Sequence, residues 1–175
     1  MGIKMTIGQG FLQELTLEAA VTRRYLASVP FDKLDFQPTE KSEKLGRLAV
    51  HVAEIVAWWK SCVEADKLDF MGFEPKEFTS SETLLAYFDG LLAEATKALS
   101  EVKNAEFKKN WSMTHGEEVY FTLPKKQVAR LFCMNHWVHH RAQLGVYLRL
   151  LGVAVPATYG PSADDFEMIL TNKFS

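Results

Sequence analysis

The chain has 175 residues, of which 47% are hydrophobic and 24% charged, a balance that is ordinary for a globular protein. Its length corresponds to roughly one domain of about 150 residues, so we expect a single domain over residues 1–175 rather than a two-domain enzyme. Twenty Lys and Arg against 22 Asp and Glu give a formal net charge of -2, which provides no broad positive field for nucleic acid or an anionic membrane surface.

Hydrophobic periodicity predicts two helices in the first part of the chain. Apolar residues recur every three or four positions over residues 11–29, and Pro30 ends this pattern. A polar linker over residues 31–40 leads to a second amphipathic helix, which we expect over residues 45–66. Residues 69–78, which contain a glycine and a proline, are expected to form a loop.

A third helix and a small hairpin are predicted next. Residues 79–82 have the form of a capping box, in which a hydroxyl accepts from the N3 amide and a glutamate reaches back. The helical pattern continues from there to Leu99. Two β-prone runs, residues 107–113 and 118–122, are separated by a turn that contains glycine, and they predict a β-hairpin.

A long fourth helix is predicted after the hairpin. Pro124 suits a first helical turn, and the apolar pattern runs from residue 128 to residue 151. A last short helix is expected over residues 164–171. Four helices of this length favour an all-α four-helix bundle, with a small β-hairpin before the last long helix and a short C-terminal helix.

Three of the five histidines lie within residues 136–140 of the fourth predicted helix. Residues four apart in a helix share one face, so His136 and His140 point the same way, whereas His139 is rotated away. Their face continues as the apolar stripe of that helix, and His51 lies on the apolar face of the second helix. The pattern therefore predicts three inward imidazoles from two facing helices.

Two interpretations of these inward histidines remain open. An ion such as Zn²⁺, Ni²⁺, Fe²⁺ or Cu²⁺ would satisfy all three rings, and three protein ligands would leave coordination positions open, as in catalytic zinc sites. Alternatively, each ring is a hydrogen-bonded core residue. Cys133 is a candidate fourth ligand, although inert buried thiols are the simpler expectation for both Cys62 and Cys133.

Two residues near His51 are candidates for supporting roles. Glu54, one helical turn later, is a candidate base or a partner that orients an imidazole. Alternatively, Glu54 only forms an ion pair with Lys60 or is exposed to solvent. Trp58, two turns after His51, is a candidate wall of the same pocket and otherwise a core aromatic.

The residues beyond the fourth-helix pair are less specific. Arg141 and Gln143 follow His140 and are expected either to position a ligand or a neighbouring helix, or to serve surface and packing roles. His139 is expected to be exposed or to lie next to the ligating residues without binding the ion, and His115 is expected at the surface. No sequence signature identifies a catalytic residue.

Two parts of the sequence carry a family resemblance. Residues 34–38 followed by 45–51 form a linker and a helix that contains His51, and residues 135–144 approach the pattern H-x-x-x-H-R-x-Q-L, with a trailing turn at 159–162. Together these features resemble the DinB/YfiT-like superfamily, which comprises bacterial metal-binding four-helix bundles. The resemblance extends over nearly the whole chain.

The resemblance has consequences for the site and its partners. It implies that His51, His136 and His140 are the ligands of a divalent metal ion, with zinc or nickel the first expectation, and that the chain forms a homodimer. Characterised members of the superfamily include thiol S-transferases and a mycothiol-dependent maleylpyruvate isomerase, so a low-molecular-weight thiol joins the expected cofactors. The resemblance leaves the metal, the substrate and the reaction open.

These inferences define two functional hypotheses. The first is a metal-dependent enzyme, of the thiol S-transferase or hydrolase type, that activates a small thiol or water. The second is a non-catalytic, stress-associated dimer that binds metal. No apolar run reaches the roughly 20 residues of a membrane span, and no secretory signal is apparent, so we expect a cytoplasmic protein that acts on a small molecule without nucleic-acid or membrane partners.

Overall fold

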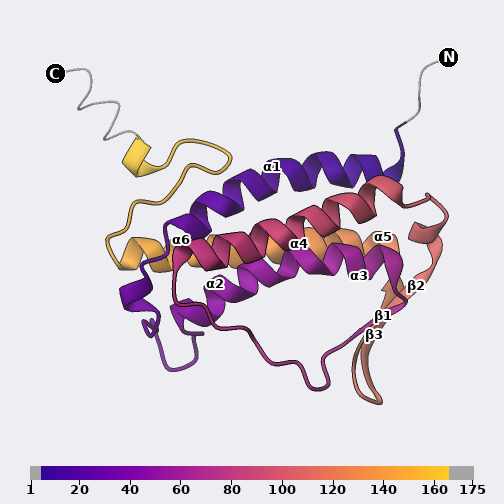
Figure 1. The fold of residues 1–175 in the computed structure, drawn as a ribbon, viewed down its shortest axis with the longest axis horizontal. Coiled ribbons are helices and arrows are strands. Elements are labelled where there is room, and N and C mark those ends of the chain that lie inside the picture. Colours follow the sequence, from indigo (N-terminus) through magenta and orange to yellow (C-terminus); the bar gives the residue numbers. More distant parts are fainter. Residues whose placement is uncertain (1–4, 166–175) are drawn as a thin grey trace.

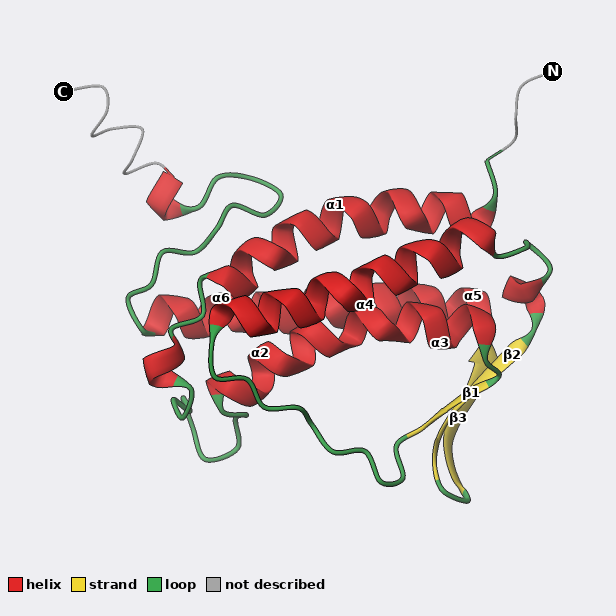
Figure 2. Ribbon diagram, in the orientation of Figure 1, coloured by secondary structure: helices red, strands yellow, loops and turns green. Residues whose placement is uncertain are grey.

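The computed structural model describes residues 5–165, and four long helical segments form its body (Figures 1 and 2). The segments are α1 (Ile7–Ala27); α2 (Leu45–Glu54), which continues through a 3-10 turn (Ile55–Ala57) into α3 (Trp58–Glu64); α4 (Ser81–Glu101); and α5 (Lys125–Val128), which continues through a π-helical stretch (Ala129–Asn135) into α6 (His136–Leu150). The predicted four-helix bundle is confirmed. In the part of the chain that is described, no helix is both long enough and apolar enough to cross a membrane.

Side-chain caps define where two of the helices begin. The hydroxyl of Thr6 accepts from the amide of Gln9 at 3.1 Å, and the Gln9 side chain accepts from the amide of Thr6 at 2.8 Å. Because of this capping box, α1 begins at Ile7, four residues before the start predicted from the apolar pattern. The predicted cap of α4 was one residue too early, because Ser80 rather than Thr79 accepts from the amide of Thr83.

A three-stranded sheet lies at one end of the bundle (Figure 2). The hairpin of β2 (Asn110–His115) and β3 (Glu118–Pro124) is confirmed, and Gly116 supplies the positive φ of 60° that its turn requires. The third strand, β1 (Lys67–Asp69), pairs in parallel with β2. The sequence pattern did not predict this strand.

The C-terminal part of the described chain turns back over the bundle. Residues 163–165 are helical, and the rest of the short helix predicted over 164–171 lies outside the described residues. Arg149 at the end of α6 forms two hydrogen bonds to Asp164, at 2.9 and 2.6 Å, and the second carboxylate oxygen also accepts from the amide of Val155. These bonds hold the returning segment against α6.

The core is built from aromatic and aliphatic side chains of all four helical segments. Trp59, Trp137 and Phe88 are fully buried. The indole of Trp137 donates to the backbone oxygen of Val52 at 2.8 Å, which ties α6 to α2. Cys62 and Cys133 are buried free thiols, as predicted. In addition, desolvation raises the pKa of the Cys133 thiol, with a further contribution from Cys62.

The contact between α1 and α4 depends on the absence of a side chain at Gly8. A Cβ atom at this position would lie 2.5 Å from the backbone oxygen of Leu99 and 2.6 Å from the Val102 side chain. We expect Gly8→Ala to lower the free energy of unfolding by about 1–3 kcal/mol, because the backbone oxygen cannot move without displacing α4. Urea denaturation followed by circular dichroism measures this loss.

Gly10 provides the matched control for that prediction. A Cβ atom there would meet nothing closer than the Met5 side chain at 3.8 Å. Gly10→Ala is therefore expected to leave stability unchanged or to raise it by up to about 1 kcal/mol, because alanine is the better helix former. Equal losses in both variants would contradict the assignment of a close contact to Gly8.

Candidate metal centre

Three histidine side chains from α2 and α6 converge on one point. The ring nitrogens that His51, His136 and His140 can offer to an ion all lie within 4.8 Å of one another. Nε2 of His51 and Nε2 of His136 are 3.1 Å apart, and the ring centroids of His136 and His140 are 4.4 Å apart. The structure thus brings together the three residues that the helical spacing predicted.

The surroundings keep these rings uncharged at neutral pH. Burial and the neighbouring imidazoles lower the pKa of His51 to about 3, and burial is the larger cause. The same causes lower the pKa of His136 to about 4, and burial lowers the pKa of His140. Neutral imidazole is the form that binds metal ions, so the cluster offers three ring nitrogens in the correct protonation state.

Gln143 fixes the orientation of one ring. Its side-chain oxygen lies 2.7 Å from Nδ1 of His140, three residues earlier in α6. Because an amide oxygen can only accept, Nδ1 of His140 carries the proton and Nε2 is left with its lone pair. Gln143 therefore has the positioning role that was one of its two expected roles.

The geometry of the cluster fits a divalent ion. Two nitrogens bound at about 2.0–2.1 Å in a tetrahedral arrangement are about 3.3 Å apart, which is close to the 3.1 Å between His51 and His136. The nitrogen that His140 can offer also lies within 4.8 Å of the other two. The donor set therefore suits zinc, nickel and similar ions.

The other candidate ligands lie outside this cluster. His139 is exposed, although its ring centroid is 5.0 Å from that of His140, and His115 lies in β2. Among the described residues, the group that can hold an ion consists of the three histidines and does not include Cys133. Arg141 faces away from the cluster and contacts α1.

Glu54 and Trp58 both lie close to the histidines. Glu54 is buried and accepts from Arg47 at 3.1 Å, whereas Lys60, its predicted partner, pairs with a different carboxylate. The Trp58 ring lies with its centroid 5.1 Å from that of His136 and 6.2 Å from that of His51. Trp58 thus forms part of a wall beside the cluster, which was one of its two expected roles.

Arg47 is a site residue that sequence reasoning missed. It precedes His51 by one helical turn, and its pairing with the buried Glu54 places it on the same face of α2. Arg47 lines two cavities that meet the histidine cluster, of about 520 and 350 Å³, and a groove of about 420 Å³ on its other side. The sequence signal that could have identified Arg47 is its spacing of four residues from His51, which places both on one face of the helix.

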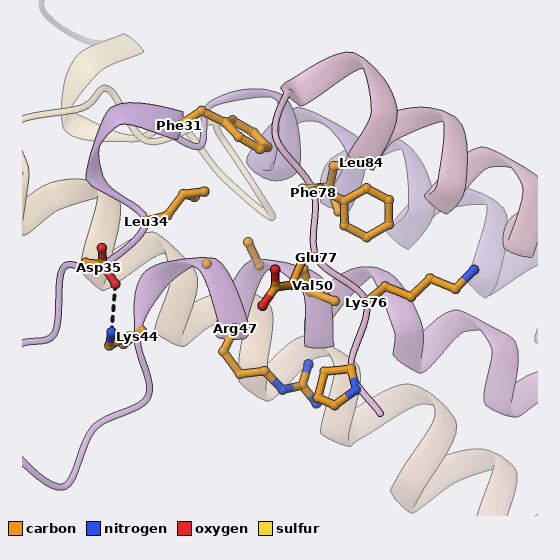
Figure 3. Close-up of a pocket in the computed structure, with 13 residues that line it drawn as sticks. Phe31, Leu34, Asp35, Lys44, Arg47, Val50, Lys76, Glu77, Phe78 and Leu84 are labelled. Carbon is orange, nitrogen blue, oxygen red and sulfur yellow. Dashed lines mark hydrogen bonds and ion pairs between the residues drawn. The ribbon is translucent and has the colours of Figure 1, made fainter. Parts of the chain in front are cut away.

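Residues of α2, among them Arg47, and of the loop before α4 line the groove (Figure 3). Apolar side chains that include Phe31, Leu34 and Phe78 line it, and the ion pair between Asp35 and Lys44, at 2.7 Å, lies at its edge. His51, His136 and His140 are not part of its lining. The cavities that adjoin the histidine cluster are therefore those of about 520 and 350 Å³.

Removing the Gln143 side-chain acceptor tests its role in orienting His140. We expect Gln143→Leu to weaken zinc binding about 10- to 100-fold, because partners that orient a ligating histidine typically contribute this much. Competition with a chromophoric chelator measures the affinity. The half-exposed Lys60 pairs elsewhere on the surface, so Lys60→Ala is a suitable control that should bind zinc normally.

The fold and the cluster define a helical bundle whose three inward histidines, from two neighbouring helices, are compatible with metal binding. The family model of the DinB family matches residues 1–172. The chain belongs to the DinB family, as the sequence resemblance indicated.

One curated protein and two solved structures are similar to the chain over most of its length. The chain is 25% identical over 160 residues to YrdA of Bacillus subtilis (strain 168), an uncharacterized protein, covering 89% of this chain and 90% of YrdA. A DinB-like protein from Bacillus cereus ATCC 10987 superimposes with a TM-score of 0.65 at 23% identity, covering 90% of this chain and 100% of that structure. The DinB-like protein YjoA of Bacillus subtilis gives a TM-score of 0.65 at 14% identity over 87% of this chain and 99% of that structure. At these identities the two structures support the fold alone.

Proposed function

We propose that His51, His136 and His140 bind a divalent metal ion, with zinc and nickel as the first candidates. We further propose that the protein is a metal-dependent enzyme of the thiol S-transferase or hydrolase type. The observation that carries the proposal is the convergence of three neutral imidazoles beside two cavities. An ion held by these three residues would lower the pKa of a bound water or thiol and would polarise a substrate oxygen.

The residues around the cluster supply binding and orientation. Gln143 holds the His140 ring, and the Trp58 ring lies beside that of His136. The larger cavity is polar, and Lys41, Ser42 and Tyr147 belong to its lining. A small thiol with polar substituents, or water, fits this environment.

The proposal extends to the setting in which the protein acts. We propose a cytoplasmic homodimer that uses a small-molecule substrate and has no nucleic-acid or membrane partner. The formal net charge of -2 supports the absence of polyanionic partners.

The second candidate function is a non-catalytic metal-binding bundle associated with stress. It is favoured by the position of the cluster between α2 and α6, where an ion would cross-link two helices. In that case the binding energy of the ion would be part of the folding energy.

Two measurements on untagged protein distinguish these functions. The zinc-, nickel- and manganese-loaded forms and the metal-free form are assayed for transfer of small thiols to electrophiles and for ester hydrolysis, and the Tm of each form is recorded. A catalytic ion abolishes turnover on removal and leaves the bundle folded. A large fall in Tm on removal, with no turnover by any loaded form, would refute the enzymatic proposal in favour of the structural one.

A further inference from the structure

The smaller cavity beside the cluster has an aromatic lining. It has a volume of about 350 Å³, within the range of small-molecule sites, and His51 forms part of its wall. A row of aromatic rings leads away from the cluster. The ring centroids of Trp58 and Phe70 are 6.0 Å apart, and those of Phe70 and Phe73 are 5.9 Å apart. Tyr87 of α4 completes the lining.

The sheet fixes the position of this aromatic wall. The amide of Phe70 donates to the backbone oxygen of Thr114 at 2.9 Å, which extends the pairing of β1 with β2. The carboxylate of Asp69 accepts from the amides of Met71 and Gly116 at 3.0 and 2.9 Å, and these bonds lower its pKa to about 2. The wall is therefore held in place before any ligand arrives.

Each charged side chain in the lining already has a partner. Arg47 pairs with Glu54, and Asp69 is satisfied by two backbone amides and by Lys67 at 3.5 Å. The lining also contains the hydroxyl-bearing residues Ser61 and Tyr87, of which the Ser61 Oγ is buried away from solvent. The cavity thus offers aromatic contact, without an unpaired charge.

The two cavities that meet at the cluster differ in character. Lysine, serine and glutamine side chains contribute to the larger one, whereas aromatic side chains dominate the smaller one. We propose that the smaller cavity binds an uncharged aromatic group of the substrate, while the larger cavity takes the small polar partner. This inference rests on the proposed function, because it names the substrate class of the same site.

The test compares two aromatic probes of similar size in the metal-free full-length protein. Calorimetric titration gives the Kd of 2-acetylnaphthalene, which is neutral, and of 2-naphthoate, which is charged. The ketone is expected to bind at least about tenfold more tightly, because a buried carboxylate would find no free cation. Equal or tighter binding of the carboxylate overturns the proposal.

Variants locate the binding in this cavity. Phe73 is 48% exposed, so Phe73→Ala should fold normally, and it is expected to weaken ketone binding roughly two- to tenfold. Tyr120→Ala is the matched control, because this aromatic residue is 54% exposed on β3 and should not affect binding. An affinity for the ketone that does not respond to Phe73→Ala overturns the assignment.

Metal content, measured on the same preparations, separates the two proposals. Stoichiometric metal uptake without ketone binding refutes the aromatic cavity and leaves the metal site standing. Ketone binding that depends on Phe73 in a protein that takes up no metal supports the cavity and refutes the proposed function.

Discussion

Replacement of His51 or His140 by alanine is expected to reduce bound metal from near one ion per chain to a trace. Each variant leaves two of the three converging imidazoles, and the lost nitrogen cannot be replaced from the described neighbours. We expect the affinity for zinc to fall by more than about 100-fold, which exceeds the effect of losing an orienting partner. Mass spectrometry of protein purified without an affinity tag measures the metal content.

His139→Ala is the control for this experiment. His139 adjoins His140 in sequence, and its ring is nearby, but it is exposed and lies outside the cluster. This variant should retain the metal content of the wild type. Loss of metal in His139→Ala, or its retention in His140→Ala, would show that the ion is bound elsewhere.

The second large effect is expected from Arg141, which is buried between α6, α1 and the C-terminal segment. Its guanidinium pairs with the carboxylate of Glu18 and donates to the Glu18 backbone oxygen, the Thr22 hydroxyl and the Tyr159 hydroxyl. Arg141→Met leaves the half-buried Glu18 without its cation. We expect a loss of about 3–5 kcal/mol in the free energy of unfolding, and urea denaturation measures it.

A double-mutant cycle isolates the ion pair from the loss of packing. Glu18→Gln removes the charge that Arg141 neutralises, so Arg141→Met should cost at least about 1 kcal/mol less in that background. Metal content of folded Arg141→Met should match the wild type, because Arg141 does not reach the histidines. Equal costs in the two backgrounds would mean that the pair contributes nothing beyond packing.

The helices and the histidine cluster were predictable from the sequence for the same reason. A spacing of four residues fixes a shared face in any regular helix, so His136 and His140 had to point together, and the apolar neighbours of His51 placed it inward. The family resemblance selected the same three residues. Only the packing of α2 against α6 remained for the structure to supply.

Other features depend on contacts that no local pattern records. β1 has three residues, and its partner β2 lies more than forty positions later, so the pairing that holds Phe70 in place had no sequence signal. The π-helical stretch at residues 129–135 departs from the 3.6-residue period on which the prediction relied. Arg47 reads as an ordinary surface charge until its pairing with Glu54 is seen.

The hydrogen bond from Trp137 to Val52 has a kinetic consequence. Trp137 directly follows His136 and Val52 directly follows His51, so a buried bond of 2.8 Å joins the Trp137 side chain of α6 to the α2 backbone beside the cluster. It holds His51 and His136, which come from different helices, in register whether or not an ion is present. Uptake and release of an ion should therefore proceed at rates set by shedding of its hydration shell and by small ring rotations, and should not require the bundle to open.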